Sequence, residues 1–173
     1  EIDLDGKIEL QGNWINNALS GFVFINRDTD GEVVFNGSDL QEIDGSRATY
    51  FEKFTLDNSV GLSLAKVTRI GADLTLNSGL LNIGDNNLLI DASANVLGAF
   101  SNSNMVVANS TGYLVKYFSA ATAFTFPVGD TTETYEYSPL SITFNTGTFA
   151  SNAYVQLNTK NQKHPSNSST THF

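Results

Sequence analysis

A short motif recurs along the chain: two apolar residues flank a third position, and Asn or Asp and then a small residue follow. Because strand side chains point alternately to two faces, each copy predicts a very short β-strand with one buried face. The Asn or Asp tolerates the left-handed backbone conformation and can bond its own backbone in a bend. The copies are Phe54-Thr55-Leu56-Asp57-Asn58, Leu74-Thr75-Leu76-Asn77-Ser78 and Leu88-Leu89-Ile90-Asp91-Ala92, with looser ones at 33–37, 142–146 and 155–159.

The spacing of these copies indicates a repeat architecture. The distance is 21 residues from Phe35 to Leu56, 20 from Leu56 to Leu76 and 14 from Leu76 to Ile90. Such periods are typical of solenoids, propellers and arrays, but a propeller blade needs about 40 residues or more. Two or three short strands per interval fit one turn of a parallel β-solenoid, with Leu56, Leu76 and Ile90 stacked inside. The intervening strands are expected at residues 62–64 and 81–83.

An antiparallel sandwich is the alternative, since its strands recur every 8 to 12 residues or so. Two features favour the solenoid: the Asn or Asp recurs at the same place after the strand, and no Asn-Gly or Asp-Gly hairpin turn lies between residues 54 and 91. Glycines in this region predict bends that need a positive φ or a close backbone approach. They stand at positions 61, 71, 79, 84 and 98.

The pattern changes near residue 122. A strand ends at Pro127, which cannot donate to a central ladder. Longer alternation then follows at 140–144 and 154–157, as in an antiparallel pair solvated on one side. We therefore predict an all-β chain with a parallel β-solenoid (β-helix) of short irregular coils at 1–122. The start of an antiparallel, β-sandwich-like module with a polar tail, truncated at the end of the chain, is predicted at 123–173.

The ends of a solenoid expose unpaired backbone and need caps. Trp14, the one tryptophan, is expected to pack over the first coil, with ligand stacking as the alternative. At the other end the strand at 154–159 is followed by a polar tail. Its free edge is expected to be covered by downstream modules of the same parent protein or by other chains of a surface assembly.

Composition narrows the function classes. The net charge of −9 argues against nucleic acid and against an anionic membrane surface. No apolar run approaches the roughly 18 residues of a membrane-spanning helix. Cysteine is absent, which excludes disulfides, thiolate zinc sites and a cysteine nucleophile. Only 16% of residues are charged, so uncharged polar residues supply the surface, as in secreted or cell-surface β proteins.

The sequence offers little catalytic chemistry. Both histidines, His164 and His172, lie in the polar tail, which argues against a catalytic triad or a zinc site, and no phosphate-binding loop is present. No cofactor is expected. Solenoid enzymes that act on polysaccharides use paired carboxylates, but three of the four candidates stand at positions that the repeat itself requires. They are Asp57, Asp73, Asp85 and Asp91. We expect a protein that is not an enzyme.

Two groups of residues are candidates for binding. Residues 26–32 resemble a calcium loop, with Asp28, Asp30 and Glu32 as ligands, but Gly37 stands where the bidentate Glu is expected. Asp30-Gly31 between apolar strands is also a standard hairpin signal, and we expect a turn here in preference to a calcium site. Exposed aromatic side chains could stack on sugars, although core packing is the alternative. These are Tyr113, Tyr117, Tyr135 and Tyr137.

Several motifs resemble the repeats of large secreted, adhesin-like surface proteins of the Bacteroidetes, which are often exported by the type IX secretion pathway. They stand at 12–17, 34–37, 54–59, 74–79, 124–130 and 137–165. The resemblance implies solenoid stalks followed by β-sandwich modules. It implies a structural or adhesive module without catalysis. The alternatives are a carbohydrate-binding β module or the non-catalytic part of a polysaccharide-active β-helix enzyme.

The same resemblance suggests a modification site. Asp130-Thr131-Thr132 resembles the short signal for O-glycosylation in Bacteroidetes, and it follows a Pro-containing turn where exposure is expected. Thr131 is therefore expected to carry a sugar in the natively produced protein.

Overall fold

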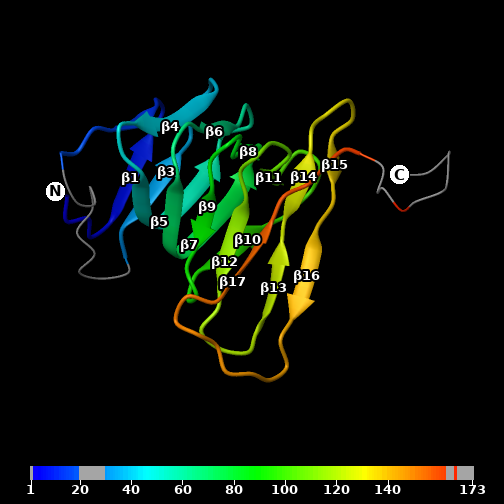
Figure 1. Ribbon diagram of the computed structural model, residues 1–173. Coiled ribbons are helices and arrows are strands. Elements are labelled where there is room, and N and C mark those ends of the chain that lie inside the picture. The colour runs from blue at the N-terminus through cyan, green and yellow to red at the C-terminus, as the bar shows by residue number, and fades with distance from the viewer. Residues whose placement is uncertain (1, 20–29, 163–165, 167–173) are drawn as a thin grey trace.

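The computed structural model describes residues 2–19, 30–162 and 166, and within them every regular element is a β-strand. Figure 1 shows these strands side by side along one axis, from the N-terminal end to the C-terminal end. No helix in this part of the chain is long and apolar enough to cross a membrane. The strands are β1 (Lys7–Leu10), β2 (Trp14–Asn16), β3 (Glu32–Phe35), β4 (Gln41–Gly45), β5 (Thr49–Asp57), β6 (Leu62–Leu64), β7 (Thr68–Ser78), β8 (Leu81–Asn82), β9 (Leu88–Ile90), β10 (Asn95–Gly98), β11 (Val106–Val107), β12 (Leu114–Tyr117), β13 (Ala123–Phe126), β14 (Val128–Asp130), β15 (Glu136–Tyr137), β16 (Leu140–Thr143) and β17 (Tyr154–Leu157).

Parallel pairing between successive coils builds the solenoid. One sheet contains β2, β4, β6, β8, β11 and β14, each parallel to the next. The other contains β1, β3, β5 and β7, also in parallel. The register between β5 and β7 shifts after Phe51, and beyond β7 this sheet divides. The first half of β7 pairs with β9 and the second half with β10, so the coil that contains β8, β9 and β10 has three strand-bearing sides.

The register explains why the apolar motif repeats. Val33 pairs with Phe54, which pairs with Leu74, which pairs with Val96. The coils from β3 to β10 thus take 20 to 22 residues on this side, and the first coil, from Ile8 to Val33, takes 25. Like residues lie above one another, and the stacked apolar side chains form the core inside the coils. The parallel β-solenoid predicted from the spacing is confirmed, and so are the intervening strands β6 and β8.

The predicted stack of Leu56, Leu76 and Ile90 is half right. Leu56 pairs with Leu76, and both are fully buried. Ile90 pairs instead with Ile70, on another side of the same core. The reason is geometric: 14 residues are less than one coil, so Ile90 lies further around the coil that contains Leu76.

Glycines make the corners, as predicted. Gly79 has a φ of +94°, and a Cβ there would lie 1.9 Å from the carbonyl oxygen of Asn58. Gly71 has an ordinary φ, but a Cβ would collide with the Tyr50 hydroxyl. The prediction that Asn and Asp residues adopt the left-handed conformation at the bends is wrong. In the described ranges Glu133 is the one non-glycine residue with a positive φ. The Asn58 side chain nevertheless bonds its own backbone in the bend, because its Oδ1 accepts from the Val60 N–H at 2.9 Å, while its Nδ2 donates to Gln41 in the preceding coil.

Buried amides tie one coil to the next at one corner. The Gln41 side chain donates to the carbonyl oxygens of Leu10 (3.0 Å) and Gly12 (2.6 Å) in the preceding coil. Asn58 in turn donates to the Gln41 side-chain oxygen at 3.0 Å, and further along Asn104 donates to the Leu76 carbonyl. All three amides are buried. An unsatisfied buried polar group costs about 1–3 kcal/mol, so these bonds hold the coils in one register.

Aromatic packing closes the N-terminal coils. Trp14 meets Phe51 edge-on at 5.4 Å, and its indole N–H donates to the Thr49 hydroxyl. Phe51 lies against Phe35 and Phe54, with ring centroids 6.1 and 5.5 Å away. The predicted packing role of Trp14 is the one observed.

The prediction of a hairpin turn at Asp30-Gly31 is wrong, because β3 pairs in parallel on both edges, with β1 and β5. No edge of β3 is left for an antiparallel hairpin partner.

The chain reverses direction after the last coil. Beyond residue 122, β14 still pairs in parallel with β11, and then β15 pairs antiparallel with β14. On the other sheet β17 pairs antiparallel with β12. The antiparallel pair β13–β16 projects beside the stack (Figure 1). At the C-terminal end the two sheets thus end on the antiparallel strands β15 and β17, while the side branch through β10 ends on a parallel strand. Within the described residues the outer edge of β17 has no strand beside it.

We expect opposite outcomes for two neighbouring substitutions. Leu76→Asp should unfold the repeat, because even Leu→Ala in a core costs about 2–5 kcal/mol and Leu76 is fully buried. Thr75→Asp should be mild, because Thr75 is on the opposite face of β7 and partly exposed. Urea denaturation measures both, and equal losses of unfolding free energy would contradict the inward and outward assignment.

Candidate functional site

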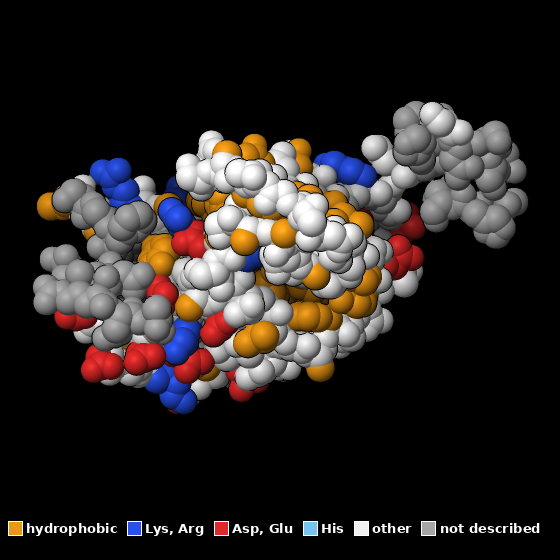
Figure 2. Space-filling view, turned by 90° about the horizontal axis from the view of Figure 1, so that it is seen from below, with side chains coloured by type: hydrophobic (Ala, Val, Ile, Leu, Met, Phe, Trp, Pro, Cys, Tyr) orange, Lys and Arg blue, Asp and Glu red, His pale blue; other side chains and the backbone are white. Residues whose placement is uncertain are grey.

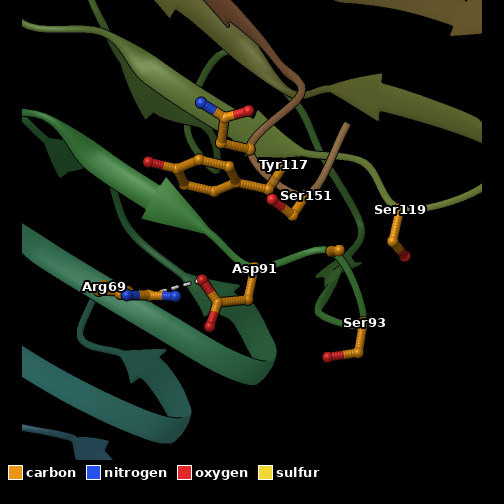
Figure 3. A pocket seen from close by; sticks show the side chains of 8 residues that line it. Arg69, Asp91, Ser93, Tyr117, Ser119 and Ser151 are labelled. Atoms are coloured by element: carbon orange, nitrogen blue, oxygen red, sulfur yellow. Dashed lines mark hydrogen bonds and ion pairs between the residues drawn. The ribbon is translucent and has the colours of Figure 1, made fainter. Parts of the chain in front are cut away.

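A hollow of about 510 Å³ lies where the antiparallel segment meets the solenoid. Its residues come from three places: β7, the turn after β9, and the end of β12 with the connection from β16 to β17. Figure 3 shows it from close by. The lining residues are Arg69, Asp91, Ala92, Ser93, Tyr117, Ser119, Ser151 and Asn152.

An ion pair between adjacent coils forms one wall. The Arg69 Nε donates to Asp91 Oδ1 at 2.7 Å. Parallel pairing brings the two together, because Asp91 N also donates to the carbonyl of Ile70. The hydrogen bond and charge of Asp91 raise the pKa of Arg69 above its ordinary value. The pair presents a guanidinium and a carboxylate with little net charge.

An aromatic ring stands beside this pair. Tyr117 is partly exposed at the end of β12, and its ring centroid is 5.9 Å from that of Tyr154 at an angle of 60°. In Figure 3 the Tyr117 ring lies over the side of the hollow that holds Arg69 and Asp91. An aromatic ring offers apolar area with little conformational freedom, and charged partners make the stronger hydrogen bonds. The hollow therefore suits a small neutral ligand that has both an apolar face and hydroxyl groups.

A buried lysine holds the turn that forms part of this hollow. Lys116 is 3% exposed, and its Nζ donates to the carbonyls of Asp91 (2.6 Å), Ala92 (3.1 Å) and Ala94 (2.6 Å). It also lies 5.2 Å from the centroid of Phe124, over the ring. Burial lowers the pKa of Lys116 to about 8. Three N–H donors meet three carbonyls, which fixes the turn that carries Asp91.

Lys116 was missed by sequence reasoning, although a signal exists. In the register Ile70, Ile90 and Lys116 lie above one another, so the lysine continues an inward-facing apolar stack. Aligning residues 88–90 with 114–116 would have revealed a lysine at a core position. The Arg69–Asp91 pair was also missed, because its partners are 22 positions apart.

The four tyrosines do not form one platform. Tyr117 is the one that lines the hollow. Tyr137, on β15, packs against Phe100 with centroids 6.5 Å apart, and Tyr135 is 53% exposed near it in sequence. Tyr113 precedes β12, and its backbone N–H donates to the Asn87 side chain.

The residues of the predicted calcium loop that can be described are engaged in other contacts. Asp28 lies outside the described residues. Asp30 is 3.5 Å from the Lys53 ammonium, and Glu32 accepts a hydrogen bond from the Thr55 hydroxyl at 2.6 Å. The described residues contain no group of three His, Cys, Asp or Glu side chains placed to hold a metal ion.

The candidate catalytic carboxylates link coils instead of facing one another. Asp73 accepts from the Asn95 side chain at 3.0 Å, and Asp91 binds Arg69. Asp85 accepts from the hydroxyls of Ser110 and Thr111, and these bonds lower its pKa. Asp57 is exposed.

The predicted glycosylation site remains a prediction. Thr131 is partly exposed directly after β14, and Thr132 beside it is exposed. The preceding Asp130 is buried.

We expect Lys116→Met to destabilise the protein by about 1–3 kcal/mol, because Met keeps the volume but removes the donor that the carbonyls of Asp91, Ala92 and Ala94 share. The folded pKa of about 8 lies below the value of roughly 10.4 for an unfolded lysine. Between these values the unfolded state binds more protons, so the wild type gains stability relative to the Met variant as the pH rises. Urea denaturation from pH 7 to 10 should show a widening gap. Lys66→Met, at a partly exposed lysine, is the control, and a gap that is constant or shrinks would contradict the account.

Comparison of the chain with protein-family models, with curated proteins and with solved structures finds no match.

Proposed function

We propose that this chain is a structural and adhesive module of a large secreted or cell-surface bacterial protein, without catalytic activity of its own. The observation that carries the proposal is the stack of parallel coils whose two sheets both end on antiparallel strands at the C-terminal end. Such a stack is a stiff segment whose length follows from the number of coils. This suits a stalk or spacer of a larger protein.

The surface is consistent with that role. Figure 2 shows many of the acidic and basic side chains of one face gathered toward its N-terminal end, a broad uncharged area in the middle, and a few charged side chains again at the C-terminal end. Apolar side chains lie open in a recess of that uncharged area (Figure 2). An exposed apolar area rimmed by polar groups is typical of an interaction surface.

The free edge of β17 is an argument for a partner strand within the same assembly. β12 occupies one edge of β17, and Tyr154 on this strand is 54% exposed. An unpaired edge presents backbone donors and acceptors to another strand. We assign this edge to downstream modules of the parent protein or to another chain of a surface assembly.

The acidic residues support the absence of catalysis. Asp73, Asp85 and Asp91 each bond to a side chain of a neighbouring coil. Carboxylates that flank a scissile glycosidic bond must instead face a shared space. Three of the four candidates therefore have a structural task in the solenoid.

Labelling of intact cells tests the location and hence the proposed role. Antibodies against the chain should label the producing bacterium without permeabilisation, or detect the protein in the medium. An antibody against a cytoplasmic protein is the control for lysis. The proposal would be contradicted if the antibodies labelled the cells only after permeabilisation. It would also be contradicted if the purified chain released products from a polysaccharide.

Carbohydrate binding at the hollow is the second candidate function. The observation that favours it is the Tyr117 ring beside the Arg69–Asp91 pair. The ring can cover the apolar face of a pyranose, while the guanidinium and carboxylate bind hydroxyls as donor and acceptor. The same chemistry would serve the non-catalytic part of a polysaccharide-active protein.

We expect Tyr117→Ala to weaken glycan binding at least tenfold, because it removes the one ring that lines the hollow. Tyr135→Ala, an exposed tyrosine outside the hollow, is the matched control and should bind as the wild type does. A glycan array identifies the ligand and calorimetry measures the affinity. A wild-type chain that binds no glycan, or equal losses in the two variants, would remove this candidate and leave the structural role.

A further inference from the structure

A second hollow, of about 340 Å³, lies at the C-terminal end of the solenoid, away from the Arg69–Asp91 pair. It forms where the antiparallel pair β14–β15 meets the segment that follows β17. Its lining is rich in oxygen-bearing side chains. The lining residues are Asp130, Glu136, Ser138, Thr159, Lys160, Asn161 and Gln162.

Asp130 is a buried carboxylate that is only half satisfied. Asp130 is 6% exposed. Its Oδ1 accepts hydrogen bonds from the Asn109 side-chain amide at 3.1 Å and from the Thr132 backbone N–H. Oδ2 is buried and has no hydrogen-bond partner in the described part of the chain. A buried oxygen without a partner destabilises the fold, and more so when it is charged.

Asp130 lines the hollow, and its Oδ2 has no partner among the described residues.

A second carboxylate stands beside it. Glu136 is directly opposite Asp130 in the antiparallel pair, so both side chains project from the same face of the sheet, and both line the hollow. Like charges directly opposite each other are destabilising. The nearby Lys160 ammonium donates to the Ser110 carbonyl at 2.9 Å, and the described residues show no ion pair between it and either carboxylate.

We propose that this hollow binds a calcium ion, with Asp130 and Glu136 as its carboxylate ligands. Calcium takes six to eight oxygen ligands, roughly, from carboxylates, carbonyls, amides, hydroxyls and water. Besides the two carboxylates, the lining supplies the hydroxyls of Ser138 and Thr159 and the amide oxygens of Asn161 and Gln162. It offers no sulfur or imidazole, which zinc and copper prefer.

The ion would hold the two sheets together at the C-terminal end of the solenoid. It would tie β14 and β15, which end one sheet, to the residues just beyond β17, which ends the other. The proposal concerns a site separate from the carbohydrate hollow and does not depend on the adhesive role.

Calorimetry and thermal unfolding of the whole chain test the proposal, with calcium chloride, magnesium chloride or EDTA added. We expect one calcium site with a dissociation constant of about 10⁻⁵–10⁻³ M, a melting temperature that rises with calcium, and weaker binding of magnesium. Glu136→Gln, at an exposed position, should keep the fold in EDTA and weaken calcium binding at least tenfold. Asp130→Asn should abolish the melting shift.

Two controls separate this site from its alternatives. Asp30→Asn, in the other acidic stretch, should bind calcium as the wild type does. Lys160→Gln should bind calcium more tightly, because a positive charge leaves the hollow. The proposal is overturned by a wild-type chain that binds no calcium. It is also overturned by binding that survives Glu136→Gln but is lost in Asp30→Asn, or by a Lys160→Gln variant that is destabilised and unresponsive to calcium.

Discussion

The parallel, in-register pairing of one coil on the next is the constraint on which the rest of this structure depends. From β3 to β7 the chain returns to the same axial line after about 20 residues, so like residues such as Phe35, Leu56 and Leu76 meet above one another. Slipping one strand by one residue would turn its apolar face outward. The buried amides of Gln41 and Asn58 oppose such a slip, because any other register leaves them unpaired.

The same register builds the hollows. Arg69 and Asp91 become neighbours because one coil separates them, and Lys116 reaches the turn at Asp91 because it occupies the next inward position of that stack. At the C-terminal end the pairing changes from parallel to antiparallel. There Asp130, on the last parallel strand, faces Glu136 on the first antiparallel one of that sheet. Both hollows thus lie where the regular coils meet the reversed chain.

Local signals predicted the fold better than the sites. The strands and the glycine corners follow from alternation and backbone sterics, which a single segment contains. The inward position of Lys116 and the parallel pairing of β14 depend on partners a full coil away, which the alternation of one strand does not specify. For the same reason Tyr117 was identified as an exposed aromatic residue, while its neighbours Arg69 and Asp91 were not joined to it.

NMR of the isotope-labelled chain tests the parallel register most directly. Nuclear Overhauser contacts between backbone protons distinguish the two kinds of pairing, because α protons approach closely across antiparallel strands but not across parallel ones. The account predicts amide-to-α contacts that link residues 33–35 to 54–56 and 54–56 to 74–76, with close α-to-α contacts between β12 and β17. Close α-to-α contacts among β3, β5 and β7 would contradict the solenoid.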